Sequence, residues 1–293
     1  MERVAVIGLG TMGGAMAANI AQAGFPAAVW NRTPERTVPL AQSGATVAES
    51  PAAAAAAADA VLICVSDTPD VEAVLFGEAG IADGAREGLL VIDCSTISPV
   101  ATRSFAERLR AARIAFVDAP VSGGSEGARN ATLSIFVGGD AADVDRARPI
   151  LEAIGKTITH VGPVGSGQAV KAVNQVILAG AYLGVAEGIV LALKAGLDVG
   201  QVVEALSGGA AQSWVLANRS GRMIDNDYPL GFKVALHRKD LGIALELARD
   251  TGAVLPVSAL CDQIEAGLVG RGHADEDMSA VARTIRELSG LPG

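Results

Sequence analysis

Aromatic residues are scarce in this 293-residue chain, which has six Phe, two Tyr and two Trp, or 3% of all residues. Half of the residues are nevertheless hydrophobic, so the interior must be built from Ala, Val, Leu and Ile. A chain of this length is about twice a typical domain, which makes two domains the first expectation. With 19% charged residues and no polar low-complexity tract, the composition is that of a folded protein.

Cysteine and basic residues are also in short supply. The three cysteines, Cys64, Cys94 and Cys261, form no Cys-x-x-Cys pair, and the three histidines have no metal-ligand spacing. We therefore expect no metal, and a reduced cytoplasmic protein is the simplest interpretation. Lys and Arg number 23 against 32 Asp and Glu, a net charge of −9, which argues against nucleic-acid or anionic-membrane partners.

A signal peptide is not expected, because the first residues lack a basic segment followed by a long apolar run. One later segment, Ala172–Leu193, carries a single charge, Glu187, and therefore has the composition of a membrane span. It also contains Asn174 and Gln175 and directly follows Lys171. A helix buried in a core or a subunit interface explains this segment better than a bilayer span.

The first half of the chain alternates strand-like and helix-like segments. Single helices between strands indicate parallel βαβ units, and hence an α/β fold: an N-terminal Rossmann domain with a doubly wound parallel sheet. The predicted strands are Arg3–Ile7, Ala27–Trp30, Val61–Val65, Leu89–Asp93, Ile114–Asp118 and Leu133–Val137.

After about His160 this alternation stops, and helical periodicity continues almost to the end. We therefore predict two domains, a Rossmann domain over residues 1–162 and an all-α domain over residues 163–293. The expected helices of the second domain are Val170–Lys194, Val199–Leu206, Leu236–Asp250, Pro256–Gly270 and Ala280–Leu288.

A Gly-x-Gly-x-x-Gly motif stands where the first predicted strand meets the first helix. Its first glycine permits a tight turn, its second lets a pyrophosphate approach the backbone, and its third lets helix and strand pack closely. A glycine-rich turn without a ligand is the alternative, but the position at the first βα junction favours a dinucleotide. The motif consists of Gly8, Leu9, Gly10, Thr11, Met12 and Gly13.

The residues after the second strand indicate which dinucleotide binds. NAD sites usually place an Asp or Glu there, whereas this chain has Asn31, Arg32 and Thr33. Arg32 can bind a 2′-phosphate and Thr33 can add a hydroxyl, so NADP(H) is favoured and NAD stays possible. Arg32 as a solvated turn residue is the alternative.

Three further segments make the chain resemble the β-hydroxyacid dehydrogenase family, which includes 3-hydroxyisobutyrate dehydrogenases and tartronate, glyoxylate and succinic semialdehyde reductases. They stand in the family's order and, with the glycine motif, span nearly the whole chain. The segments are Asp118-Ala119-Pro120-Val121-Ser122-Gly123-Gly124, then Gly165-Ser166-Gly167-Gln168-Ala169-Val170-Lys171-Ala172-Val173-Asn174-Gln175, then Lys239-Asp240-Leu241.

Some of these residues suit the chemistry on their own. The amides and hydroxyl of Ser122, Gly123 and Gly124 could hold a carboxylate, although such a sequence also suits a plain turn. Lys171 opens the most apolar helix, where an amine usually reaches towards solvent, but partial burial would lower its pKa into the range that suits proton transfer. Asn174 and Gln175 follow on the same helix face.

The resemblance implies roles for individual residues in hydride transfer between the nicotinamide and a small carboxylate substrate. Lys171 is then the general acid/base. Asn174 and Gln175 orient the substrate, and Phe232 and Asp240 line the closed site; Lys239 and Asp240 as a solvated charge pair is the alternative. The residues expected at the cofactor, besides the glycine motif and the end of the second strand, are Val65, Ser66, Thr96 and Lys239.

Two residues depart from the family's usual pattern. Gln175 replaces an Asn that many members have, as in tartronate semialdehyde reductases, and Ala131 stands where a glycine is common. An imine reductase or a non-catalytic dinucleotide-binding module are the alternatives, and both usually lack the lysine that Lys171 provides. The apolar helix after Lys171 predicts a homo-oligomer, a dimer or a tetramer.

Overall fold

The computed structural model describes residues 2–292, which fold as two units that divide between Lys171 and Ala172. The predicted boundary at residues 162 and 163 lies at the end of strand β9 (Gly155–Gly162). Helix α9 (Ser166–Lys194) begins after that strand and continues across the division, so it contributes residues to both units.

Nine strands form one sheet among the described residues of the first unit. Their order is β3-β2-β1-β4-β5-β6-β8-β7, and β9 pairs with β8. The strands β2, β1, β4, β5 and β6 run parallel, which confirms the predicted Rossmann arrangement. Their bounds are β1 Val4–Ile7, β2 Ala27–Trp30, β3 Thr46–Val47, β4 Ala60–Ile63, β5 Leu90–Asp93, β6 Ala115–Asp118, β7 Val121–Ser122 and β8 Leu133–Gly138.

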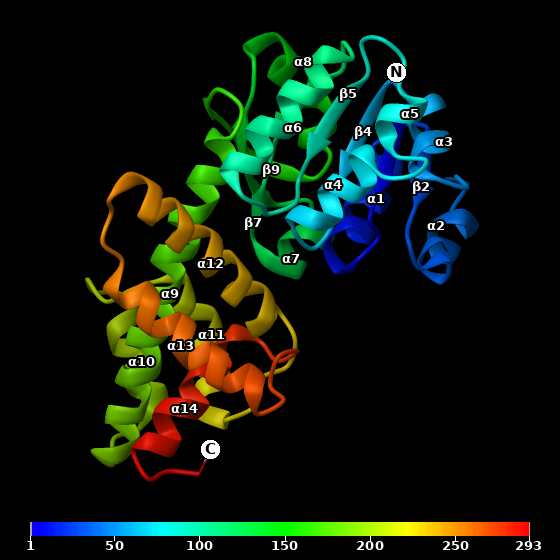
Figure 1. Cartoon of the computed structure of the whole chain (residues 1–293). Helices are drawn as coiled ribbons and strands as arrows, with labels where there is room; N and C mark the ends of the chain where they lie inside the picture. The colour runs from blue at the N-terminus through cyan, green and yellow to red at the C-terminus, as the bar shows by residue number, and fades with distance from the viewer. Residues whose placement is uncertain (1, 293) are drawn as a thin grey trace. The chain divides into compact units, whose positions relative to one another are not determined.

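Helices cover both faces of this sheet, as Figure 1 shows. Helices α1, α7 and α8 pack on one face and α3 to α6 on the other. Their bounds are α1 Thr11–Gln22, α2 Val38–Gln42, α3 Pro51–Ala56, α4 Thr68–Phe76, α5 Ile81–Gly84, α6 Pro99–Ala111, α7 Gly124–Arg129 and α8 Ala141–Glu152, with a 3₁₀ turn at Pro34–Thr37.

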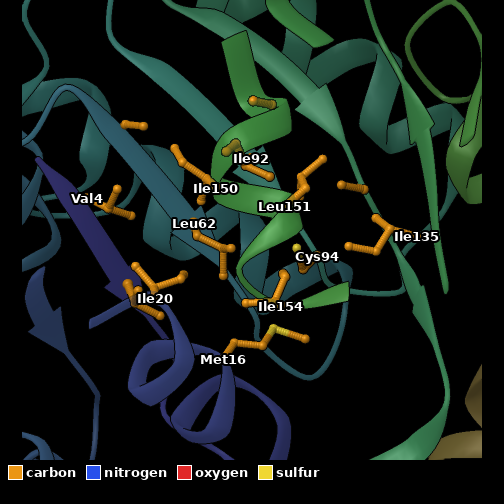
Figure 2. Packing of buried hydrophobic residues seen from close by; sticks show 14 of the residues in the cluster. Val4, Met16, Ile20, Leu62, Ile92, Cys94, Ile135, Ile150, Leu151 and Ile154 are labelled. Atoms are coloured by element: carbon orange, nitrogen blue, oxygen red, sulfur yellow. The ribbon is translucent and has the colours of Figure 1, made fainter. Parts of the chain in front are cut away.

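Alternate side chains of each central strand therefore enter different cores. In β1, Val4 and Val6 face one core, whereas Ala5 and Ile7 face the other. Burial on both faces explains why these strands are continuously apolar rather than alternating with polar residues. Figure 2 shows the first core, in which aliphatic side chains of strands and of helices α1 and α8 interlock: Val4, Met16, Ile20, Leu62, Ile92, Ile150, Leu151 and Ile154.

The sheet is mostly parallel, as predicted, and its far edge adds antiparallel pairs that the sequence did not predict. β7 and β8 form a hairpin around the short helix α7, and hairpin strands must be antiparallel. β8 also meets β6 in the antiparallel direction. Very short or largely exposed elements were not predicted from the sequence; they are β3, β7, β9, α5 and α7.

The second unit is helical, as predicted. Helix α11 was not expected, because its sequence mixes polar and apolar residues, but its helical spacing turns Val215, Leu216 and Met223 inward. The hydrophobic core of the second unit is largely aliphatic and includes two buried aromatic residues, Tyr182 and Tyr228. The helices after α9 are α10 Val199–Ser207, α11 Trp214–Asp225, α12 Val234–Thr251, α13 Pro256–Gly270 and α14 Val281–Leu288, with a 3₁₀ turn at Met278–Ala280.

Helix α9 is the one described helix that by length and composition alone could cross a membrane, with a mean hydropathy of 2.1 over an 18-residue window. Within that window 39% of the residues are buried in the protein. Gln175 is fully buried and hydrogen-bonded to Asp240 of α12, an interaction suited to a helix packed in protein.

Candidate active site

The glycine motif forms the turn between β1 and α1. Gly8 has a φ of +91°, and a Cβ on Gly13 would overlap the carbonyl oxygen of Gly8, so neither position tolerates a side chain. At Gly10 the nearest atom to an added Cβ is 3.6 Å away, on Arg36. The backbone at Gly10 is thus open enough for a ligand to approach the N-terminus of α1.

Asn31, at the end of β2, holds this turn in place. Its Oδ1 accepts a hydrogen bond of 2.8 Å from the backbone N–H of Leu9, and its Nδ2 donates to the carbonyl of Thr33 at 2.8 Å. Asn31 therefore links the glycine turn to the loop that follows β2. The carbonyl of Thr33 is occupied by this bond, and its side-chain hydroxyl lies on the exposed side of the turn.

Arg32 follows on the surface, with 82% of its side chain exposed. Its Nη1 lies 3.0 Å from Oδ1 of Asp70 at the start of α4. A second guanidinium, that of Arg36, lies beside Gly10 and was not identified from the sequence. The signal for it was available, because Arg36 follows Arg32 by four residues, in the same turn after the second strand.

The ends of β4 and β5 lie next to the glycine turn, because β4 pairs with both β1 and β5. The backbone N–H of Val65 donates to Oγ of Ser95 at 3.0 Å, which ties the two strand ends together. Ser66 is exposed and Thr96 half-buried. Carboxyl ends of parallel strands are where dinucleotides bind in such sheets, and the predicted residues Val65, Ser66 and Thr96 all lie there.

Asp118, the last residue of β6, organises the start of α9. It is fully buried, and its carboxylate accepts hydrogen bonds from the backbone N–H groups of Gly165 (2.7 Å) and Gln168 (2.9 Å). Burial raises the pKa of Asp118 to about 6, although these hydrogen bonds act in the opposite direction. The sequence analysis placed Asp118 in a family segment but did not identify this role.

The side chain of Gln168 connects the start of α9 to the loop after β5. Its Oε1 accepts from the N–H of Ile97 at 3.1 Å, and its Nε2 donates to the carbonyl of Ser95 at 2.8 Å. Thr96 lies between these two bonded residues, so Gln168 fixes its loop. Lys171 follows one turn later in the helix and is 7% exposed.

Ser122, Gly123 and Gly124 form the turn from β7 into α7. Gly123 and Gly124 have φ values of +134° and +62°, a conformation that side chains disfavour, and Ser122 is half-buried. Glycine adopts these conformations without strain, so the sequence suits the turn, and such turns can form anion-binding concavities.

The second unit brings four of its predicted site residues into one hydrogen-bonded group. Gln175 is fully buried; its Nε2 donates to Asp240 Oδ2 at 2.6 Å and its Oε1 accepts from Asn174 Nδ2 at 2.7 Å. Lys239 Nζ lies 3.0 Å from the other oxygen of Asp240. The predicted charge pair thus exists, but Asp240 is 3% exposed rather than solvated.

Phe232 precedes α12 and meets His237 edge to face, with ring centroids 6.1 Å apart. Its backbone N–H donates to Asp277 Oδ2 at 2.9 Å, and Asp277 also pairs with Arg222 at 3.0 Å. The loop that carries Phe232 is therefore held by a buried carboxylate.

Comparisons with known proteins agree with this arrangement. Residues 3–162 match the NAD-binding domain of 6-phosphogluconate dehydrogenase, and residues 165–285 match the NAD-binding region of NADP-dependent 3-hydroxyisobutyrate dehydrogenase. The 2-hydroxy-3-oxopropionate reductase of Escherichia coli is 41% identical over 97% of this chain and 97% of its own length. The chain belongs to the β-hydroxyacid dehydrogenase family.

Solved structures support the same assignment. The Mycobacterium tuberculosis 3-hydroxyisobutyrate dehydrogenase, solved with L-serine, is 35% identical with a TM-score of 0.89, covering 98% of this chain and 99% of its own. An imine reductase from Pseudomonas sp. has a TM-score of 0.65 at 23% identity, a likeness of fold alone. This β-hydroxyacid dehydrogenase is an NAD(P)-dependent oxidoreductase with a nicotinamide cofactor, which confirms the predicted family, fold and class of enzyme.

Proposed function

We propose that this enzyme reduces the aldehyde of a three-carbon carboxylate of the 2-hydroxy-3-oxopropionate type and oxidises the corresponding 3-hydroxyacid. The observation that carries the proposal is the 41% identity to the E. coli 2-hydroxy-3-oxopropionate reductase over nearly the full length of both chains. Two other relatives are named for L-serine: the mycobacterial structure contains it, and the L-serine dehydrogenase of Pseudomonas aeruginosa is 34% identical to this chain. L-serine has the same three-carbon skeleton as 2-hydroxy-3-oxopropionate, a carboxylate with oxygen on C3.

A substrate panel tests this proposal. NADPH or NADH absorbance is followed in both directions. Reduction is measured with tartronate semialdehyde (another name for 2-hydroxy-3-oxopropionate), glyoxylate and succinic semialdehyde, and oxidation with 3-hydroxyisobutyrate and L-serine. We expect the highest kcat/KM with tartronate semialdehyde. A higher value with succinic semialdehyde or 3-hydroxyisobutyrate would reassign the substrate, since one methylene or methyl group changes binding by about 1–3 kcal/mol.

The glycine turn would hold the pyrophosphate of the cofactor, because Gly10 leaves the N-terminus of α1 open while Gly8 and Gly13 fix the turn. Thr11 and Met12 supply the first backbone amides of that helix. Val65, Ser66 and Thr96, at neighbouring strand ends, would line the path of the cofactor towards the nicotinamide. Lys239, from the second unit, is assigned to the cofactor by resemblance.

NADPH is the preferred cofactor in this proposal, and Arg32 with Arg36 would bind its 2′-phosphate. Arg32→Ala should raise the KM for NADPH about 10- to 100-fold, the effect of a lost charge-assisted hydrogen bond, and leave that for NADH nearly unchanged. Asp70→Asn is the matched control, because it removes the ion pair but keeps the guanidinium, so the KM for NADPH should stay or fall. A wild type that prefers NADH contradicts the assignment.

Lys171 is proposed as the general acid/base. When bound, the nicotinamide cofactor would supply a hydride to the carbonyl carbon of the substrate. Nζ of Lys171 would donate its proton to the carbonyl oxygen as that oxygen becomes the hydroxyl, and in oxidation it would take that proton back. Asn174 would orient the substrate beside the amine. Ser122, Gly123 and Gly124 would bind the substrate carboxylate through their amides and hydroxyl, and Phe232 would line the site.

Replacing Lys171 separates this role from a simple charge anchor. Lys171→Ala should lower kcat by about 10²- to 10⁴-fold while NADPH still binds, and Lys171→Arg should not restore turnover, because a guanidinium keeps its proton. The pH profile of oxidation should lose one ionisation in the alanine variant. A variant Lys171→Arg with substantial turnover, or an alanine variant defective only in substrate KM, would make Lys171 a carboxylate anchor.

We also propose that the enzyme is a cytoplasmic homo-oligomer, with residues 1–162 for the cofactor and 163–293 for substrate and assembly. Large apolar side chains of α9 stay exposed within the chain: Val173 (55%), Ile177 (65%) and Leu191 (71%). A second copy of the chain that packs on this helix would bury them. Cys64, Cys94 and Cys261 form no disulfide, which suits a reducing compartment.

A further inference from the structure

A histidine and a glutamate form a fully buried pair inside the second unit. His237 of α12 and Glu265 of α13 are both 0% exposed, and Nδ1 of the ring lies 2.6 Å from Oε1 of the carboxylate. Neither residue was assigned a role from the sequence. A buried polar pair of this kind usually adds little stability over an apolar pair of the same size, so its presence calls for another explanation.

A metal site is the first alternative, since Cys261 completes a cluster whose ligand atoms all lie within 4.8 Å of one another. However, burial raises the pKa of the Cys261 thiol, which keeps it protonated, and its sulfur lies 3.8 Å from the same Glu265 oxygen that the ring contacts. The Nδ1–Oε1 distance is that of a direct hydrogen bond. The cluster is a hydrogen-bonded pair with a neutral thiol beside it.

The second ring nitrogen of His237 points to the active-site helix. Nε2 lies 3.4 Å from the backbone carbonyl oxygen of Gln175 in α9. One turn further along α12, Asp240 accepts the hydrogen bond from the side-chain amide of the same Gln175. Helix α12 therefore holds one residue of α9 at two points, its backbone and its side chain, which fixes how α9 is rotated at this turn.

The position of Gln175 in turn affects the side chain of Asn174. The amide of Gln175 is used on both sides, by Asp240 and by Asn174, whose Nδ2 donates to Gln175 Oε1 at 2.7 Å. The direction of the Asn174 side chain thus depends on Gln175, and Gln175 depends on His237 and Glu265. Gln175 itself is fully buried, which favours a supporting role over direct substrate contact.

We propose that His237 and Glu265 are positioning residues of the active site, which hold the Gln175 turn of α9 so that Asn174 presents its amide to the substrate. This inference rests on the proposed function, in which Asn174 orients the substrate. The pair touches neither substrate nor cofactor. Apolar side chains of similar size would fill the same space, but they could not bond to the Gln175 carbonyl.

The double variant His237→Leu/Glu265→Met tests this directly, because it leaves no unpaired buried charge. We expect a fold as stable as the wild type, unchanged NADPH affinity by fluorescence titration, and a kcat/KM for tartronate semialdehyde lower by about 10- to 100-fold, mostly through KM. The matched control is His273→Leu/Glu276→Met, which removes the other His–Glu pair of this unit, 2.8 Å apart and partly exposed. It should keep kcat/KM within about twofold of the wild type.

Coupling to Asn174 separates positioning from a general structural effect. In an Asn174→Ala background the double variant should cause no further loss, since the side chain that it orients is gone. Equal losses in both backgrounds would overturn the proposal, as would a double variant with normal kinetics. If the double variant does not fold, Glu265→Gln should retain kcat/KM within about threefold, because its side-chain amide can donate to Nδ1 and the neutral ring then keeps Nε2–H for the Gln175 carbonyl. A larger loss would refute the inference. A wild type inactive on tartronate semialdehyde would instead contradict the proposed function, and the series would then be run on the substrate that the panel identifies.

Discussion

Replacing Asp118 by asparagine is expected to change the stability of the first unit in a pH-dependent way. Asp118 is fully buried, and its carboxylate accepts backbone hydrogen bonds from Gly165 and Gln168 at the start of α9. Asparagine has the same shape and one acceptor oxygen but cannot ionise. Its Nδ2 would face one of the two N–H donors, but this cost does not depend on pH. The change of the free-energy difference with pH therefore reports the contribution of the carboxylate charge.

The sign and size follow from the pKa of Asp118, which burial raises from 3.8 to about 6. At pH values between 3.8 and about 6, Asp118 is mostly protonated in the folded state and mostly ionised in the unfolded state. The stabilisation from this group is complete below the unfolded pKa and is lost as the pH rises through about 6. At about 1.4 kcal/mol per pKa unit, the loss is about 3 kcal/mol, and the asparagine variant escapes it.

Urea denaturation at about pH 4 and about pH 7.5 measures this difference. Both proteins should carry Trp214→Phe, because Trp30 then reports on the first unit alone. We expect the free energy of unfolding of Asp118→Asn, relative to Asp118, to rise by about 2.4 kcal/mol between the two pH values, because the unfolded carboxyl is already partly ionised at about pH 4. A relative free energy that stays constant, or that falls with pH, would mean that the backbone hydrogen bonds outweigh the cost of burying the charge.

Two further expectations concern the glycine turn and the exposed face of α9. Gly13→Ala should abolish NADPH binding in a fluorescence titration, because its Cβ would overlap the Gly8 carbonyl, whereas Gly14→Ala, with its nearest neighbour 3.6 Å away, should bind normally. In sedimentation velocity at micromolar concentration the wild type should be at least a dimer and Ile177→Glu, at a side chain 65% exposed within the chain, should dissociate it. A monomeric wild type would disprove the oligomer.

The bounds of several strands and helices could be predicted from the sequence, because their buried residues form continuous apolar runs or a regular helical pattern. β2 and α13 have the predicted bounds, and β1, β4 and β5 differ by one or two residues, because burial on both faces produces unbroken apolar runs. β9 was missed since Gly155–Gly162 exposes most of its side chains and carries no apolar pattern. The antiparallel hairpin of β7 and β8 was missed because pairing direction depends on how the intervening chain turns.

The candidate site shows a similar division. The glycine turn could be predicted because its backbone geometry demands glycine at particular positions, and Arg36 could have been identified from its spacing to Arg32. The contacts of Asn31, Gln168 and His237 could not, since they join residues far apart in sequence, such as Gln168 and Ser95. Periodicity places a residue on a helix face but does not name its partner on another element.

Helix α9 explains why buried carboxylates occur in both units. In the first unit Asp118 binds the helix at Gly165 and Gln168, and in the second unit Asp240 and the His237–Glu265 pair bind it at Gln175. Lys171 lies between these two attachments along the helix. An apolar helix packed only by aliphatic side chains can rotate and slide at little cost, because dispersion contacts are weakly directional. Hydrogen bonds are directional, so each attachment limits how α9 can rotate at its own turn, which the proton-donor role proposed for Lys171 would require.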